Sequence, residues 1–214
     1  MEALSVTYAI GHVRRSLDEL ETNASAMLGQ EMDGASIDVI CAACLPEAVE
    51  YVHRNAPLAL LDGIAAEPDD MEVLDGGVYL EIRMKRKMER LLYVRCSDSG
   101  NVVTTAVQED SPEGRMQLNP YTRGTYDSPV LVRMASGEGL KPVFRYYSPR
   151  AQENDRELHL GYIPHQDKGL PVYMVSGRAV NAVLDRLVGL VLYSFSDADK
   201  AAIFFSKADK WDNA

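Results

Sequence analysis

The residues of this chain best suited to chemistry are its three cysteines and four histidines. Cys41 and Cys44 form a CxxC motif, which is half of a zinc site, but no second CxxC or HxxxH pattern completes it. Both cysteines fall on the apolar face of a predicted helix, so we interpret them as buried core thiols in preference to a metal or redox pair. The histidines are scattered over different predicted elements without HExxH or HxH spacing: His12, His53, His159 and His165. The sequence therefore predicts no metal site.

Motifs that bind nucleotides or activate a nucleophile are also missing from the sequence. It contains no GxGxxG, P-loop lysine or GxSxG pattern, and the glycines at 76–77 and 136–139 have the context of turns. We therefore expect no catalytic residues and no cofactor, and we classify the chain as a non-enzyme. An enzyme of unrecognised type is the last-ranked alternative.

One short cluster of bases stands out: Lys85, Arg86 and Lys87, flanked by Glu81 and Glu89. Such a cluster can contact phosphate groups of nucleic acid or of a small ligand. A simpler interpretation is the exposed tip of a hairpin that stays soluble or meets an acidic face of a neighbouring subunit. We prefer that second interpretation.

The segment EPDDMEVLD, residues 67–75, carries five acids and no base and is followed by two glycines. A calcium-binding loop needs a denser and more regular spacing of carboxylates. We therefore interpret residues 67–77 as a solvated connector.

Composition limits the class of protein. Hydrophobic residues make up 46% and charged residues 25%, as in an ordinary soluble globular protein. The net charge of -10 argues against a main surface that clings to nucleic acid. An odd number of cysteines fits a reducing compartment, and the absence of a long apolar stretch leads us to expect neither export nor membrane anchoring.

Hydrophobic periodicity predicts helices at both ends of the chain, at 5–22, at 36–55 with a Ser36 cap and a kink or break at Pro46, and at 176–195 and 196–211 with a Ser196 cap. Strand-like patterns fill the middle: residues 78–84, 90–96, 102–108, 129–134, 141–147 and 157–163. The first two of these segments, 78–84 and 90–96, are separated by the basic cluster, so we expect them to form a hairpin. The connections are too short for crossover helices, so we expect an α+β fold with a central antiparallel sheet region.

These patterns also predict the domain organisation. We expect an N-terminal helical part (1–66), the connector (67–77), an antiparallel β part (78–175) and a C-terminal helix pair (176–214). The helix pair is expected to form one composite domain with residues 1–66.

The sheet pattern is interrupted by EDSPEGRMQLNPYTRG, residues 109–124. Asp110 or Ser111 can cap a short helical turn that begins at Pro112, and Asn119 followed by proline ends it. We expect residues 109–128, here called the protrusion, to present side chains to a partner; a long loop packed on its own sheet is the alternative. The candidate interface residues are Met116, Tyr121, Arg123 and Tyr126, together with Lys85, Arg86 and Lys87.

The layout over residues 5–208 resembles the head-to-tail adaptor proteins of tailed bacteriophages and prophages, also called connector, neck or head completion proteins. The resemblance is carried by the protrusion with its DSPV re-entry and by the helices AVLDRLVGLVLYSF and SDADKAAIFFSKA. It implies a structural virion protein, made in the cytoplasm of the bacterial host, that forms a ring, commonly of twelve subunits. Such a ring would dock beneath the portal protein, contact the next tail or neck protein, and line the passage for DNA ejection without binding DNA specifically. No membrane partner is implied.

The alternative from another class is a small-ligand or carbohydrate-binding α+β module without catalysis. In that hypothesis the aromatic side chains of Tyr146, Tyr147 and Tyr162 line a groove.

Overall fold

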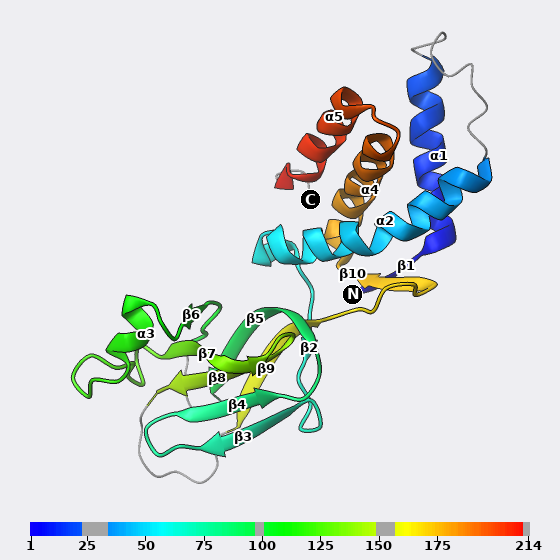
Figure 1. Ribbon diagram of the computed structural model, residues 1–214. Coiled ribbons are helices and arrows are strands. Elements are labelled where there is room, and N and C mark those ends of the chain that lie inside the picture. Colours follow the sequence, from blue (N-terminus) through cyan, green and yellow to red (C-terminus); the bar gives the residue numbers. More distant parts are fainter. Residues whose placement is uncertain (23–33, 97–100, 149–156, 212–214) are drawn as a thin grey trace. The chain divides into compact units, whose positions relative to one another are not determined.

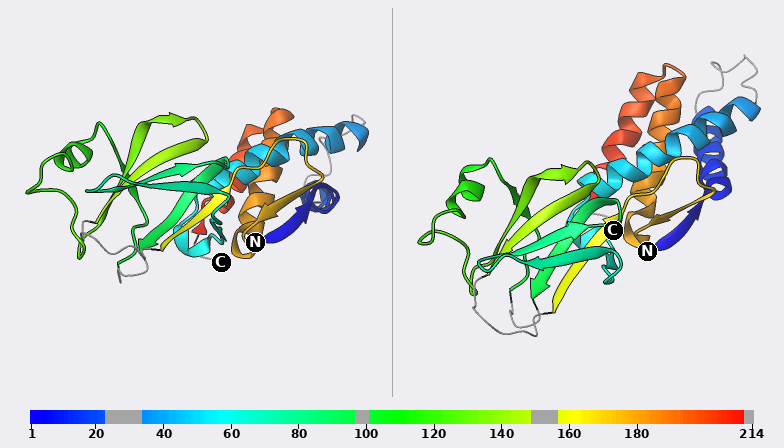
Figure 2. Two further views of the ribbon diagram at one scale, coloured as in Figure 1. Left: turned by 90° about the horizontal axis from the view of Figure 1, so that it is seen from below. Right: turned by 60° about the horizontal axis from the view of Figure 1, so that its bottom comes forward.

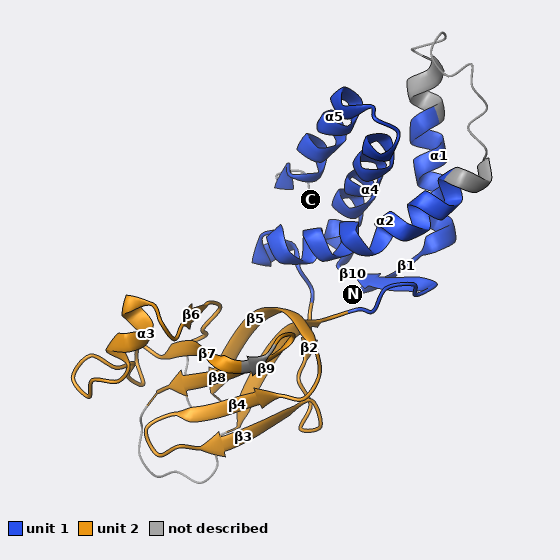
Figure 3. Cartoon of the chain, in the orientation of Figure 1, with its two compact units in different colours: residues 1–62, 166–214 blue, residues 63–165 orange. Residues whose placement is uncertain are grey.

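The computed structural model describes residues 1–22, 34–96, 101–148 and 157–211, and shows the expected α+β architecture (Figure 1). N-terminal helices precede a central region of mostly antiparallel strands, and a helix pair follows it. The chain divides into two compact units, unit 1 with residues 1–62 and 166–214 and unit 2 with residues 63–165 (Figure 3).

Unit 1 is a helical bundle accompanied by a small two-stranded sheet. Its elements are β1 (Glu2–Ser5), α1 (Val6–Thr22), α2 (Gly34–Asn55), η1 (Leu58–Leu60), β10 (Val172–Val175), η2 (Gly177–Ala179), α4 (Val180–Ser194) and α5 (Ala198–Ala208). Apolar side chains recurring every three or four residues turn to one face of each helix, and Val13, Leu45 and Leu187 are fully buried there. Buried apolar side chains from the helices therefore form the interior of this unit.

Two predicted helix caps are wrong. The helix α2 begins at Gly34, so Ser36 lies within it, and the helix continues through Pro46 without a break. The cap of α5 is Asp197, whose side chain accepts a hydrogen bond from the backbone N–H of Lys200. Ser196 cannot serve as the cap because it has φ 63° and makes the tight corner between α4 and α5.

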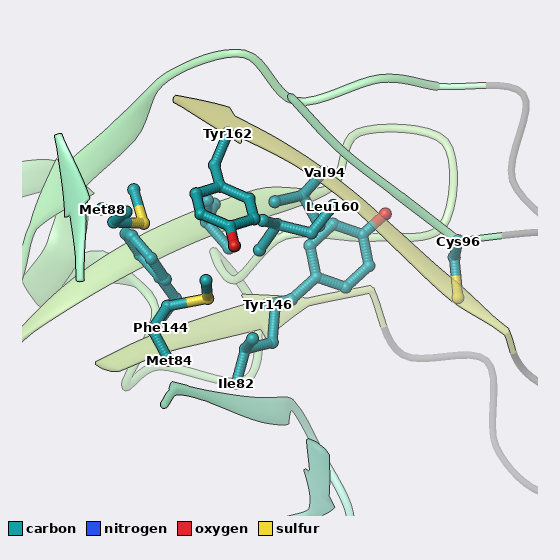
Figure 4. Packing of buried hydrophobic residues seen from close by; sticks show 10 residues of the cluster. Ile82, Met84, Met88, Val94, Cys96, Phe144, Tyr146, Leu160 and Tyr162 are labelled. Carbon is teal, nitrogen blue, oxygen red and sulfur yellow. The ribbon is translucent and has the colours of Figure 1, made fainter. Parts of the chain in front are cut away.

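Unit 2 consists of two sheets that share a core. Its elements are β2 (Ile64–Ala65), β3 (Met71–Asp75), β4 (Leu80–Met84), β5 (Met88–Cys96), β6 (Ala106–Gln108), α3 (Pro112–Met116), β7 (Val130–Glu138), β8 (Lys141–Tyr147) and β9 (Leu158–Pro164). One sheet has the order β2-β9-β5 and the other the order β3-β4-β8-β7-β6. Alternate residues of both sheets form one buried cluster that includes Ile82, Val94, Phe144, Leu160 and Tyr162 (Figure 4).

The predicted hairpin of residues 78–84 and 90–96 is not formed. The strand β4 pairs with β3 and β8, whereas β5 pairs with β9 in the other sheet. Met84 and Met88, on either side of the basic cluster, are both buried in the shared core. The turn at 85–87 therefore carries the chain from one sheet to the other, which local alternation cannot reveal.

Two further strand predictions differ from the structure. Residues 71–75 of the expected connector form β3, an edge strand paired with β4 from Met71↔Met84 to Asp75↔Leu80. The strand expected at 102–108 is confined to Ala106–Gln108, and it pairs with β7 in parallel. Val103 makes only an isolated bridge to Val94.

Unit 2 is an insertion into unit 1. Its first strand β2 pairs with the end of β9, with Ile64 opposite Tyr162, so the chain enters and leaves the unit side by side. The unit begins at residue 63 and ends at 165, whereas the β part expected from the sequence spanned 78–175. The difference at the C-terminal side arises because β10 pairs with β1 in unit 1.

Candidate protein interface

The protrusion begins with a capped helical turn, as its sequence predicts. Ser111 is the N-cap of α3, and its side chain accepts a hydrogen bond from the Gly114 N–H at 3.0 Å. Pro112 occupies the first turn, where its missing N–H costs nothing. Gly114 is buried against the end of β6, where a Cβ atom would overlap the Gln108 carbonyl oxygen. The turn is thus fixed to the edge of the sheet.

A buried glutamine holds the rest of the protrusion together. The Gln117 side chain donates to the Glu113 carbonyl at 2.9 Å and accepts from the Gly124 N–H at 2.6 Å. The Thr122 hydroxyl donates to the Met116 carbonyl at 2.7 Å. Gly124 packs so closely that a Cβ atom would lie 2.7 Å from the Tyr147 carbonyl oxygen. The loop is therefore internally hydrogen-bonded and anchored to β8.

Three large apolar side chains are exposed on this fixed loop. Tyr121 is 96% exposed, Leu118 74% and Met116 50%, and α3 projects beyond the strands of unit 2 in each view (Figures 1 and 2). Leu118 was not among the candidates chosen from the sequence, because only its exposure distinguishes it from a core leucine. The remaining two candidates of the protrusion, Arg123 and Tyr126, are partly buried.

The basic turn 85–87 is exposed, but Arg86 is engaged within its own unit. Its Nε atom lies 2.6 Å from the Asp70 carboxylate, whose side chain is only 3% exposed. The same carboxylate accepts from the Tyr162 hydroxyl at 3.2 Å, and the Asp70 carbonyl accepts from the Lys85 N–H at 2.8 Å. Burial, followed by the charge of Asp70, raises the pKa of Tyr162. Asp70, which belongs to the acidic segment 67–75, thus holds the basic turn in place.

A second buried carboxylate lies on the other side of the turn. Glu89 contacts His165 Nδ1 at 2.9 Å, and the backbone N–H of His165 donates to the Lys87 carbonyl. The acidic segment and the basic turn therefore interact inside one chain through Asp70 and Arg86. Arg86, the central base of the tip, already has an internal partner. It is therefore less available to an acidic face of a neighbouring subunit than the sequence suggests.

The two groups of candidate residues are not brought together. The protrusion follows β6, one edge of the five-stranded sheet, while the basic turn follows β4, which is next to the opposite edge. The strands β8 and β7 separate them. They form two distinct surfaces of unit 2.

The groove proposed for a ligand-binding module is not formed by its three tyrosines. Tyr146 and Tyr162 belong to the core between the sheets (Figure 4). Tyr147 is buried in a smaller cluster with Val132 and Met134. These three tyrosines occupy buried strand positions, so their large rings pack in the core. The prediction that these three tyrosines line a groove is therefore wrong, while the ligand-binding module itself stays a prediction.

The chemistry of the cysteines agrees with a packing role. Cys41 is buried and Cys44 half-buried, and both are free thiols. Burial, with a smaller effect of the Asp38 charge, raises the pKa of Cys41 to about 12, and burial also raises the pKa of Cys44. Within the described residues, no three acidic, histidine or cysteine side chains gather in a way that would hold a metal ion.

Among the helices of the described segments, none is both long and apolar enough to cross a bilayer. No model of a known protein family and no curated protein matches this sequence.

Proposed function

We propose that this chain is a structural virion protein, the subunit of a head-to-tail adaptor ring that docks beneath a portal protein and lines the passage for DNA. It acts by contact with copies of itself and with neighbouring virion proteins, and its site is a protein interface. The resemblance of the chain layout to such adaptors supports this proposal.

The protrusion is the observation that carries it. An apolar side chain on a mobile loop loses conformational entropy when it binds, whereas Leu118 and Tyr121 stand on a loop already fixed by Gln117 and Gly124. Exposed apolar side chains on a rigid support are suited to a protein contact, and tyrosine is a residue type that anchors such contacts. A surface loop without a binding partner needs neither exposed apolar side chains nor a rigid support for them.

The charge of the chain supports the part of the proposal that concerns DNA. A net charge of -10 disfavours tight binding to phosphates, and the basic turn is partly neutralised by Asp70. A wall of this kind would let DNA slide past.

The test uses the full chain and the portal protein encoded in the same phage or prophage genome. The mixture is examined by sedimentation and by electron microscopy, and we expect annular complexes that contain both proteins. Leu118→Ala with Tyr121→Ala should fold as the wild type does but lose a large part of this association. Val102→Ala removes an exposed apolar side chain outside the protrusion and serves as the matched control. Failure of the wild-type chain to join the portal protein would refute the adaptor function.

A further inference from the structure

We propose that the side chain of Gln166 blocks the outer edge of β10 and thereby keeps this strand from pairing with β10 of a second copy of the chain. In the described part of the chain β10 pairs with β1 alone, so its other edge is the place where a further strand could add. The inference concerns unit 1 and the control of its self-association, and it does not depend on the adaptor function.

The ladder between β1 and β10 shows which backbone groups face this outer edge. In an antiparallel pair, the residues of one strand direct their N–H and C=O groups alternately to the partner strand and away from it. The Pro171 carbonyl accepts from the Val6 N–H across the pair at 3.1 Å, which extends the register of the two strands by one position. Met174, three positions beyond Pro171 and opposite Ala3, therefore directs both of its backbone groups to the outer edge.

The amide of Gln166 takes the place of a paired strand at this edge. Its Nε2 atom donates to the Met174 carbonyl at 2.7 Å, and its Oε1 atom accepts from the Met174 N–H at 2.6 Å. A side-chain amide offers the same donor and acceptor as a peptide group. Both outward groups of Met174 are therefore satisfied without a neighbouring strand.

The loop that follows Gln166 is fixed beside β10. The Tyr173 hydroxyl accepts from the N–H groups of Gly169 at 3.0 Å and of Leu170 at 3.2 Å, and Tyr173 is only 1% exposed. Gly169 has φ 81°, a conformation that glycine adopts without strain. The Gln166 amide is thus presented to Met174 by a loop that is held within its own chain.

Without this amide, the outer edge of β10 is suited to pairing with itself. Val172 and Met174 lie on one face of the strand because they are two residues apart, and each is 40% exposed. The strand VYMV contains no charged residue, so two such strands in an antiparallel pair bring no like charges together. An unpaired edge of this kind is a template for the same edge of another molecule. A second copy is therefore the partner that Gln166 excludes.

The first test compares the full chain with Gln166→Ala and Gln166→Met by sedimentation velocity over a range of concentrations. We expect both variants to fold as the wild type does by circular dichroism and to self-associate about tenfold more tightly, because the two freed groups of Met174 form hydrogen bonds between copies. Gln108→Ala, which changes an exposed glutamine of β6, is the matched control and should behave as the wild type. Association of both Gln166 variants equal to that of the wild type would overturn the inference.

A second substitution locates the contact. Adding Met174→Pro to Gln166→Ala removes the outward N–H, and proline is tolerated at an edge position whose N–H faces away from the partner strand. The double variant should return to the association of the wild type. Association that stays as tight as in Gln166→Ala would place the contact elsewhere and refute the role given to β10.

Hydrogen exchange measures the amide contact itself, at a concentration where the copies do not associate. The Met174 N–H should exchange slowly in the wild type, although it faces away from β1, and about tenfold faster in Gln166→Ala. The Tyr173 N–H faces β1 and should stay protected in both proteins, which controls for opening of the sheet. Equal exchange of the Met174 N–H in the two proteins would show that Gln166 does not block the edge. A portal protein takes part in none of these measurements, so their outcome is separate from that of the adaptor function.

Discussion

At the scale of single residues, a buried acid decides the shape of the basic turn. Asp70 binds Arg86 through its carboxylate, Tyr162 through the same group, and the Lys85 N–H through its carbonyl. Removing one partner of a buried and hydrogen-bonded charge leaves the others without compensation. Asp70 is thus a structural acid within an otherwise exposed acidic segment.

Replacing Asp70 by asparagine should therefore lower the stability of unit 2. We expect the free energy of unfolding to fall by about 1–3 kcal/mol, because the ion pair with Arg86 is lost and Tyr162 keeps a weaker acceptor. Urea unfolding followed by tyrosine fluorescence measures the change. Asp69→Asn, one residue away and exposed, is the control and should stay within about 0.5 kcal/mol of the wild type. Equal effects of the two substitutions would contradict this role.

The cysteines offer a second prediction, which concerns pH. With a pKa of about 12, the Cys41 thiol of the folded chain should react with a disulfide reagent at pH 8 about a thousandfold more slowly than an ordinary thiol. Its rate should rise about tenfold per pH unit, as the thiolate fraction does. The folded chain holds this proton more tightly than the unfolded chain, so the resulting stability is fully present below the ordinary thiol pKa and is lost as the pH rises towards about 12.

Reaction at Cys41 is identified by mass spectrometry after digestion. In denaturant the same thiol should react at the ordinary rate, which controls for the reagent. Rapid labelling of Cys41 in the folded chain at pH 8 would show that the thiol is accessible and ionised, against its burial in α2.

At the scale of elements, the protrusion depends on two glycines for close approach. Gly114 lies against the end of β6 and Gly124 against β8, and a side chain at either would meet backbone oxygen. Backbone atoms cannot move aside as a flexible side chain can. The close fit of the two glycines therefore fixes the position of the loop. The hydrogen bonds of the Gln117 side chain form only in that position.

Gly124→Ala should accordingly destabilise unit 2 by about 1–3 kcal/mol, because the added methyl group displaces Gly124 from Tyr147 and Val130. Gly11→Ala in α1 is the matched control, since nothing lies within 4 Å of the added atom and alanine favours the helix. That control should stabilise unit 1 by about 0.5–1 kcal/mol. Thermal and urea unfolding compare the two, and a neutral Gly124→Ala would show that the loop can shift without cost.

At the scale of the whole molecule, the sequence of unit 2 is inserted into that of unit 1, and two adjacent strands mark the start and end of the insertion. β2 and the end of β9 are antiparallel neighbours, so both ends of residues 63–165 emerge together. An insertion of this geometry adds a complete core without interrupting the packing of its host. The core between the two sheets and the core of the helical unit are therefore formed from separate parts of the chain.

The fragment 63–165 should fold alone. We expect a cooperative urea transition and a circular dichroism spectrum dominated by strand, since its core residues all lie inside this range. The fragment 78–165 is the control and should not fold stably, because it lacks β2, β3 and Asp70. A fragment 63–165 that unfolds without the helices would show that unit 2 depends on unit 1.

Much of this organisation is readable from the sequence. The three- and four-residue spacing of Val13, Leu17 and Leu184, Leu187 predicts the helices, and the alternation of Leu80, Ile82 and Met84 predicts a strand, because these patterns express burial on one face. The cap and turn chemistry of Ser111 and Pro112 predicts α3 correctly. Tyr121 was chosen from the sequence as an exposed residue, and the structure places it there.

The remaining features depend on contacts between distant segments. Local patterns predict most of the helices and strands and the position of the short capped turn, because neighbouring residues decide backbone conformation and amphipathic pattern. Contacts between distant segments place β4 and β5 in different sheets, bind Arg86 to Asp70, and bury Tyr146, Tyr147 and Tyr162. Pairing and burial of this kind depend on which strand lies alongside which, and alternation along one strand carries no information about its partner.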